Sequence, residues 1–215
     1  MLLNKLSPIL VVILLAFAVQ GCESSTENEP NESDLYFHIG DVSQYLYAND
    51  TTYQQDKIIG QTRRSDNLKV FIKEILYKSK RGISQHLSYE FVRDGYYFST
   101  ELEKTTDSLY KDNPYKEFKY NKVNITQGGN WKAAEGIPDS INIQFSVKNV
   151  DELETPAGKF TNIYSVYYYD KTMNTEVDQF YSKEYGRLGL RDNWEKILLN
   201  YVKRENIELG TKVEF

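Results

Sequence analysis

Few side chains in this sequence could act as a nucleophile, a general base or a metal ligand. The 215 residues include one cysteine and two histidines, His38 and His86. A Ser–His–acid triad would need one of these histidines, and the sequence contains no Gly-x-Ser-x-Gly motif. One cysteine excludes both an intrachain disulfide and a multi-cysteine zinc site. We therefore interpret both histidines as surface or interstrand residues and expect no catalytic residue.

Two pairs of acidic residues have a spacing that could support glycoside hydrolysis. Glu101 and Glu103 are two residues apart, and so are Glu152 and Glu154, so on a strand each pair would share one face. Glycosidases use two carboxylates at a fixed separation across the sugar. Acid pairs of this kind are also common on solvent-exposed faces. A glycan-acting hydrolase is therefore kept as an alternative, and the expected protein is not an enzyme.

A third acidic group could in principle hold calcium. It consists of Asp170, Asn174, Glu176 and Asp178. The spacing differs from the Asp-x-Asn-x-Asn-Gly run of a dedicated calcium loop. We therefore expect a solvated turn here, and no metal or cofactor.

The single cysteine, Cys22, follows a segment with the character of a secretion signal. Residues 1–21 contain Lys5 near the start and an unbroken run of eleven apolar residues from Ile9 to Val19. A membrane-spanning helix needs roughly 20 apolar residues, so this run is too short to remain as a span. It fits the hydrophobic region of a signal peptide, which predicts export.

The residues around Cys22 resemble the lipobox of bacterial lipoproteins, in which an aliphatic, a variable and a small residue precede a cysteine. Val19, Gln20, Gly21 and Cys22 fill these places. The resemblance implies cleavage between Gly21 and Cys22, a thioether-linked diacylglycerol on Cys22 and acylation, as with palmitate, of the new amino terminus. Several acyl chains, at about 0.8 kcal/mol per buried CH₂, would hold the protein at a membrane. An ordinary signal peptide followed by a chance cysteine is the alternative.

An acidic tether is expected after the signal peptide. Residues 22–34 contain five acidic residues and no basic or aliphatic residue, so they cannot bury enough surface to offset the entropy of ordering. The remaining residues, 35–215, carry 25 basic and 26 acidic side chains, and this net charge of −1 argues against a nucleic-acid partner. The tether also resembles export tags of surface-displayed lipoproteins. We expect an outer-membrane location and leave periplasmic or external exposure open.

Alternating apolar and polar residues predict strands through residues 35–215. The run Ile141–Val147 is typical of an antiparallel strand with one solvent-exposed face. In the run 160–169, Phe160, Tyr164, Val166 and Tyr168 are expected to share one face. Similar runs occupy residues 45–47, 68–76, 87–91, 96–98 and 177–181. Asp94-Gly95 predicts a two-residue hairpin, and Thr155–Gly158 a turn within a longer connection.

Residues 192–204 are ambiguous between helix and strand. Apolar residues recur at helical spacing at Trp194, Ile197, Leu198, Tyr201 and Val202. Asp192 and Glu195 could form a capping box ahead of this helix. Read as a strand, the segment instead places Ile197, Leu199 and Tyr201 on one face.

Four motifs together resemble a group of uncharacterised β-rich bacterial lipoproteins. They are Tyr36–Asp41 with Tyr45–Tyr47, Gly129–Trp131, Thr155–Asn162 and Gly186–Leu190. The sequence departs from that group in lacking a Trp and a Pro in the first motif and in carrying Arg187 between the last glycines. The resemblance implies a closing strand at 194–202 and a shape similar to the curved sheets and open barrels of periplasmic lipid carriers. It supplies no catalytic residues.

The expected organisation is a signal peptide (1–21), a flexible acidic tether (22–34) and one mainly β domain (35–215). That domain should be a curved antiparallel sheet or open β-barrel with room for one short helix. Its 18 Tyr, 10 Phe and 2 Trp either cover a half-exposed sheet or form a platform for an apolar or glycan ligand.

We expect a non-enzymatic envelope lipoprotein, held to the membrane through Cys22, with a binding or accessory role. The alternatives are a carrier of a lipid or other apolar small molecule in an open barrel, and the glycan hydrolase. A continuous apolar cavity would favour the carrier, and a packed interior would favour an interaction module. A cleft containing two acids at catalytic separation would favour the hydrolase.

Overall fold

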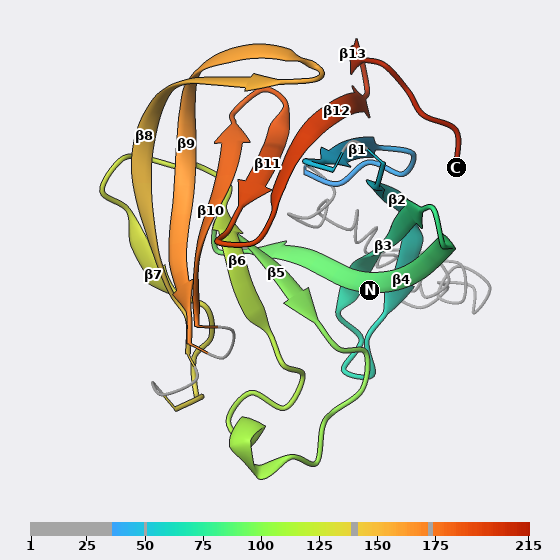
Figure 1. Cartoon of the computed structure of the whole chain (residues 1–215). Coiled ribbons are helices and arrows are strands. Elements are labelled where there is room, and N and C mark those ends of the chain that lie inside the picture. The colour runs from blue at the N-terminus through green and yellow to red at the C-terminus, as the bar shows by residue number, and fades with distance from the viewer. Residues whose placement is uncertain (1–35, 50, 139–141, 172–173) are drawn as a thin grey trace, which may run out of the picture. The chain divides into compact units, whose positions relative to one another are not determined.

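The computed structural model describes residues 36–215 except 50, 139–141 and 172–173 (Figure 1). Gly21, Cys22, the signal peptide and the tether therefore lie outside the described residues. The described residues form one mainly β domain, a nearly closed antiparallel barrel, which confirms the predicted fold class. Within them, no helix is both long enough and apolar enough to cross a membrane.

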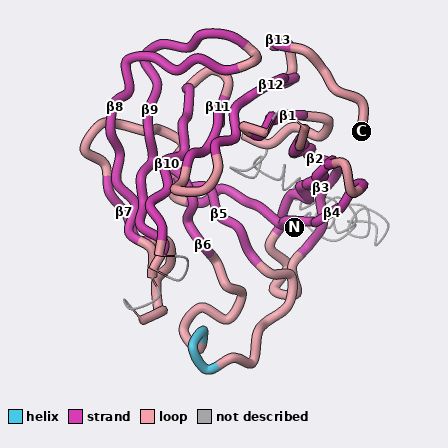
Figure 2. The backbone as a smooth tube through the Cα atoms, viewed as in Figure 1, coloured by secondary structure: helices cyan, strands magenta, loops and turns pink. Residues whose placement is uncertain are grey.

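The barrel is built from two antiparallel meanders that meet at the β1–β12 pair. Hydrogen bonding gives the order β6-β5-β4-β3-β2-β1-β12-β11-β10-β9-β8-β7, and β13 pairs with β12 beside this path. Figure 2 shows the strands and the long loop between β5 and β6, which contains a 3₁₀ turn. The strands are β1 (Val42–Tyr47), β2 (Tyr53–Arg63), β3 (Lys69–Ser79), β4 (Gly82–Arg93), β5 (Tyr96–Thr100), β6 (Phe118–Lys122), β7 (Asn130–Lys132), β8 (Gln144–Thr155), β9 (Gly158–Asp170), β10 (Thr175–Ser182), β11 (Gly186–Arg191), β12 (Lys196–Arg204) and β13 (Ile207–Gly210).

The two end strands, β6 and β7, approach each other closely enough to bring the sheet near closure. The backbone N–H of Lys119 in β6 donates to the carbonyl of Ala133, just after β7, at 2.5 Å. The rings of Tyr96 and Trp131 meet edge to face with their centroids 6.2 Å apart. These contacts connect the ends of the sheet path.

The two predicted turns have different outcomes. Asp94 and Gly95 have φ of 53° and 72° and connect the paired residues Arg93 and Tyr96, so the two-residue hairpin is confirmed. The longer connection predicted before Thr155–Gly158 is wrong. Thr155 pairs directly with Gly158, and residues 148–154 belong to β8, where they pair with β9. The β8–β9 hairpin is therefore long and tightly turned.

A left-handed residue in β9, Asn162, overturns the predicted common face of residues 160–168. Asn162 has φ of 53°, and the faces of β9 change there, although the pairing of β9 with β8 keeps the same register on both sides of it. Phe160 therefore packs with Ile163 in one buried cluster. The other buried cluster contains Tyr164, Val166 and Tyr168.

Within the ambiguous segment 192–204, residues 196–204 form strand β12, in agreement with the strand that the family resemblance implied, and residues 192–195 connect it to β11. Asn200, Tyr201 and Val202 are all buried in succession, so both faces of this strand are covered. The tip of the β8–β9 hairpin covers one side, where the backbone N–H of Ala157 donates to the carbonyl of Leu199 at 3.0 Å. Apolar residues on both faces of a central strand imitate a helical pattern, which explains the local ambiguity.

Apolar residues pack on both faces of the sheet. Val70, Phe91 and Phe98 lie on one face of β3–β5 beside Leu102 of the β5–β6 loop. The opposite face carries Phe71 and a second apolar cluster. Because the loop supplies a cover for the first face, the barrel does not need to hold all of its apolar side chains inside.

Candidate functional site

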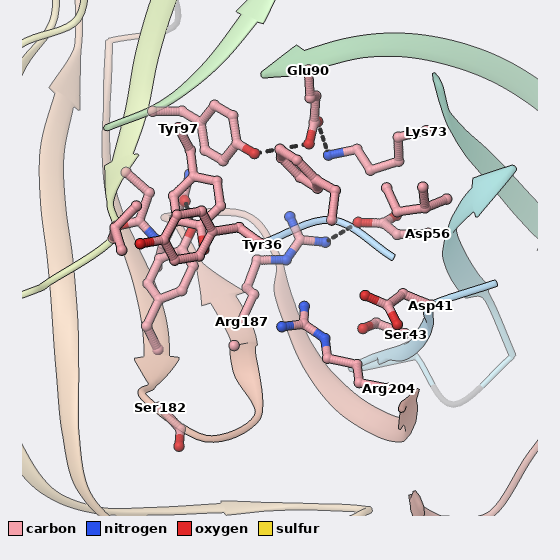
Figure 3. A pocket seen from close by; sticks show the side chains of 18 of the residues that line it. Tyr36, Asp41, Ser43, Asp56, Lys73, Glu90, Tyr97, Ser182, Arg187 and Arg204 are labelled. Atoms are coloured by element: carbon pink, nitrogen blue, oxygen red, sulfur yellow. Dashed lines mark hydrogen bonds and ion pairs between the residues drawn. The ribbon is translucent and has the colours of Figure 1, made fainter. Parts of the chain in front are cut away.

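The barrel contains an open cavity of about 390 Å³. Its walls come from β1 to β6 and from β10 to β12, so both meanders contribute. Figure 3 shows the labelled side chains converging from these strands. Six basic and three acidic side chains line the cavity, together with tyrosines and aliphatic residues. Such a mixed lining is suited to a ligand that has both polar and apolar parts.

Strand alternation brings charged residues into this interior. Lys73 and Glu90 occupy polar positions of the predicted strands 68–76 and 87–91, and the structure turns both toward the cavity. Their apolar neighbours Val70 and Phe91 face the loop-covered side of the sheet. The side chain of Glu90 is 3 % exposed and that of Lys73 is 19 % exposed. The polar face of these strands therefore lines a cavity.

A hydrogen-bonded ion pair fixes Glu90 in the wall. Lys73 Nζ contacts one carboxylate oxygen, and the Tyr120 hydroxyl donates to the other at 2.8 Å. Burial alone would lower the pKa of Lys73, but the charges of Glu90 and Asp56 outweigh it and raise that pKa. Burial, followed by the charge of Glu90, raises the pKa of Tyr120 well above its ordinary value. Glu90 is therefore held as a partnered carboxylate.

A second pair fixes Asp56 and Arg187 across the cavity. Arg187 Nη2 donates to Asp56 Oδ2 at 3.1 Å, and Gln54 Nε2 donates to Asp56 Oδ1 at 2.7 Å. The Arg187 guanidinium also lies 4.3 Å from the ring centroid of Tyr45. Burial alone would lower the pKa of Arg187, but Tyr45 and Asp56 raise it. Arg187 is thus a fixed cation at physiological pH.

Aromatic residues form the apolar part of the wall. The rings of Phe37 and Tyr97 meet edge to face at 5.6 Å, and Tyr36 contacts Tyr97 at 5.9 Å. Burial raises the pKa of Tyr97 to about 12, so its hydroxyl remains protonated at neutral pH. These rings offer flat apolar surface beside the charged groups.

Arg204, at the end of β12, differs from the other charged residues of the cavity. Its guanidinium lies against Gly186, where an added Cβ would come within 2.6 Å of Nη1. Its Nε is buried and has no hydrogen-bond partner among the described residues. Figure 3 shows the Arg204 and Arg187 guanidinium groups turned into the same space. Arg204 therefore adds a positive charge to the cavity that no described carboxylate neutralises.

The chain matches no protein-family model, no curated protein and no solved structure.

The histidines considered for catalysis lie apart from each other. The side chain of His38 is 40 % exposed, with Nδ1 3.5 Å from Asp41 and Nε2 3.0 Å from Glu205. His86 is exposed on β4, and its ring meets Tyr77 edge to face. The structure places them as the sequence analysis expected, on the surface and between strands.

The acidic groups considered for catalysis or calcium binding do not converge. Glu152 is half exposed and pairs with Lys159 at 2.6 Å, whereas Glu101 lies beyond the end of β5. In the proposed calcium group, Asp178 accepts from Ser165 at 2.6 Å and pairs with Arg191 at 2.8 Å. Among the described residues, no three His, Cys, Asp or Glu side chains are arranged to hold a metal ion.

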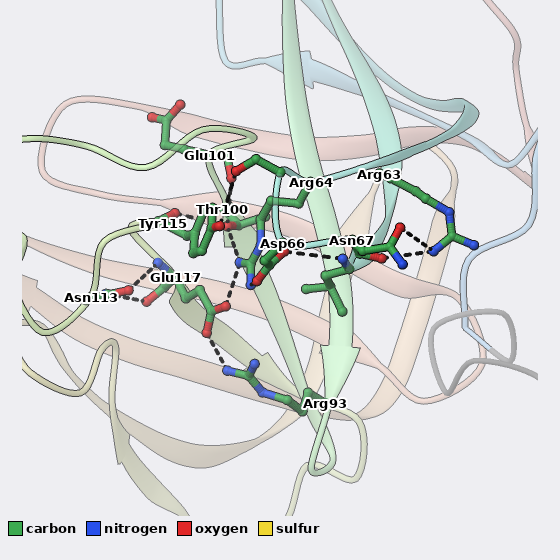
Figure 4. Close-up of polar contacts among 12 residues, drawn as sticks. Arg63, Arg64, Asp66, Asn67, Arg93, Thr100, Glu101, Asn113, Tyr115 and Glu117 are labelled. Carbon is green, nitrogen blue, oxygen red and sulfur yellow. Dashed lines mark hydrogen bonds and ion pairs between the residues drawn. The ribbon is translucent and has the colours of Figure 1, made fainter.

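A second polar cluster lies under the β5–β6 loop and is fully partnered (Figure 4). Arg64, only 4 % exposed at its side chain, donates to both carboxylate oxygens of Asp66 at 2.9 and 2.7 Å. It also donates to Thr100 at 2.9 Å and Glu117 at 2.5 Å. The ring of Tyr115 lies 3.9 Å from its guanidinium carbon. We infer that this cluster holds the β5–β6 loop against the barrel.

The sequence analysis assigned none of the charged cavity residues to a site, and it noted Arg187 only as a departure from the family motif. Asp56, Lys73 and Glu90 each occupy strand positions that are ordinary for exposed charges. The available signal was the apolar character of both faces of β3 and β4, with Val70 beside Phe71 and Phe91 beside Val92. A strand with apolar residues on both faces has no obvious solvent-exposed face, so a single charged residue within it is expected to be buried.

Proposed function

We propose that this protein is a non-enzymatic binding protein of the bacterial envelope, and that its barrel cavity holds a small ligand. The supporting observation is the 390 Å³ cavity with walls that ion pairs already hold in place. This volume falls within the range of small-molecule sites. Since the charged walls are fixed before a ligand arrives, binding costs little ordering of side chains.

A carrier of an apolar molecule is the second candidate, and the aromatic part of the wall favours it. Phe37, Ile58 and Ile125 are buried residues that line the cavity. A purely apolar ligand would, however, bury Arg187 and Arg204 without offering them a partner, which costs free energy. A ligand with an apolar body and a polar group fits the wall better than a hydrocarbon chain alone.

The glycan hydrolase has less support. Glu90 is the most buried acid of the cavity, and its two oxygens are occupied by Lys73 and Tyr120. Neither oxygen of Glu90 is therefore free to contact the glycosidic oxygen of a sugar. Asp56 is likewise held by Arg187 and Gln54.

The cavity is tested by saturation-transfer NMR of the purified full-length protein with 4-phenylbutyrate, 4-phenylbutyramide and 4-phenylbutanol. We expect saturation transfer to at least one of these probes. Ser43→Phe, on β1, and Val123→Trp, just after β6, fill the cavity from two directions and should abolish the saturation transfer. The control Ser84→Phe, at an exposed site on β4, should retain it. No transfer to any probe in the unmodified protein, or equal transfer in the filled variants, would overturn the proposal.

The envelope location rests on the sequence around Cys22. We propose that Cys22 is lipidated after cleavage at Gly21 and anchors the barrel to the outer membrane through the tether 22–34. Cys22→Ala should leave the protein either unprocessed or in the soluble fraction of lysed cells. Membrane retention and processing identical to the unmodified chain would contradict the anchor, while the cavity proposal would stand.

A further inference from the structure

The charges of the cavity do not balance. Its lining contains three acids, Asp41, Asp56 and Glu90, and each already has a described partner. His38 lies 3.5 Å from Asp41, Arg187 binds Asp56, and Lys73 binds Glu90. The cavity is lined by six cations: Lys57, Lys73, Lys122, Lys183, Arg187 and Arg204. The cations therefore outnumber the acids in the folded protein, and this excess of positive charge favours binding of a negatively charged group.

Arg204 is the cation best placed to meet that negative group. Lys122 lies over the rings of Tyr96 and Trp131, at 5.1 and 5.6 Å, and Lys183 is exposed at the rim. The guanidinium of Arg204, by contrast, is seated on Gly186, whose lack of a side chain leaves it room. A buried N–H without a partner is unfavourable, and an oxyanion in the cavity would supply the missing acceptor.

We infer that the ligand of this cavity is a small organic anion, with a carboxylate, sulfonate or phosphate group bound by Arg204 beside Arg187. The inference rests on the proposed binding function of the same cavity. A planar guanidinium donates two parallel hydrogen bonds to such groups, which a lysine cannot do. The aromatic wall formed by Tyr36, Phe37 and Tyr97 receives the apolar body of the ligand.

The inference is tested with an isosteric pair of probes, 4-phenylbutyrate and 4-phenylbutyramide, which differ in the charge of one group. Dissociation constants are measured for the full-length protein by calorimetry or by titration in NMR. We expect the carboxylate to bind at least about tenfold more tightly than the amide. Arg204→Gln should reduce this preference to within about twofold, and Arg204→Lys should give an intermediate value because it keeps the charge and loses the bidentate geometry.

The control variant is Lys183→Gln, which removes a lining cation whose side chain is exposed. It should leave the preference for the carboxylate within about twofold of the unmodified protein. Equal affinity for both probes, or an unchanged preference in Arg204→Gln, would overturn the anion inference while the binding function stands. If neither 4-phenylbutyrate nor 4-phenylbutyramide binds, the anion inference is overturned, and the binding function falls with it only if 4-phenylbutanol also fails to bind.

A competition experiment with inorganic sulfate tests whether the apolar body of the ligand contributes to binding. Sulfate is added at about 10 mM, which is roughly a hundredfold above a dissociation constant of about 0.1 mM. We expect sulfate to leave 4-phenylbutyrate bound, since it offers nothing to the aromatic wall. Full displacement by sulfate would show a site for free inorganic anions and would overturn the assignment of an organic ligand.

Discussion

Two arginines of this barrel, Arg64 and Arg204, have opposite surroundings. Arg64, under the β5–β6 loop, is bound by Asp66, Thr100 and Glu117 and lies over an aromatic ring. Arg204, in the cavity, has a buried Nε without a described partner. An arginine whose donors all have partners thus stabilises the fold, whereas an arginine with an unpartnered donor can bind a ligand. Whether the donors of an arginine have partners therefore separates the two roles, which residue type alone does not.

The largest effect expected from this comparison concerns Arg64. Arg64→Met should lower the free energy of unfolding by about 3–5 kcal/mol, because it removes a buried cation from Asp66 and leaves Glu117 with Arg93 alone. The measurement is chemical denaturation followed by the fluorescence of the two tryptophans. The neighbouring Arg63, exposed and bonded to the carbonyl of Asn67, is the matched control, and Arg63→Met should cost under about 0.5 kcal/mol. Equal losses of unfolding free energy in Arg64→Met and Arg63→Met would contradict the structural role of Arg64.

The opposite result is expected at Arg204. Arg204→Met should leave the free energy of unfolding unchanged or raise it by up to about 1–3 kcal/mol, because it removes a buried donor that has no described partner. The same denaturation experiment, without added ligand, measures this change. A loss of more than about 1 kcal/mol would assign Arg204 to the structural class of Arg64.

The smallest effect is a pH dependence confined to the loop cluster. The hydrogen bonds from Arg64 lower the pKa of Asp66 to about 2, compared with 3.8 for an ordinary aspartate. Its contribution to stability is therefore complete above pH 3.8 and is lost as the pH falls toward 2. Because Asp66 is 36 % exposed, solvent screening limits the contribution to less than about 1 kcal/mol.

Asp66→Asn tests this pH dependence. The difference in unfolding free energy between Asp66→Asn and the unmodified protein should shrink as the pH is lowered from 4 to 2. A constant difference over that interval would show that the charge of Asp66 is not what stabilises the loop. The cavity residues need not be altered for this measurement, so it isolates the loop from the ligand site.

Local patterns predicted the strands well, because alternation and turn chemistry act over a few residues. The Asp94-Gly95 hairpin follows from the tolerance of these residues for positive φ. The left-handed conformation of Asn162 was not predicted, since a single residue of this kind leaves no trace in the apolar pattern. Strand β12 was ambiguous because its second covered face is provided by Ala157, more than forty positions earlier in the chain.

The cavity could not be predicted for a different reason. Its charged residues come from strands that are far apart in the sequence, with Asp56 on β2 and Arg187 on β11. Pairing between such residues depends on barrel closure and on register, neither of which the local sequence determines. The use of the β5–β6 loop as an outer cover also decided which strand face became the interior.

The wall of the cavity contains Tyr36 and Phe37, the first two described residues of the chain, which follow Cys22 by only fourteen and fifteen positions. In the proposed lipidated protein, tension in the tether would act first on Tyr36 and Phe37. A ligand bound against these rings would stabilise the cavity wall, and tension in the tether would weaken ligand binding. Ligand binding and tension would then be coupled through Tyr36 and Phe37.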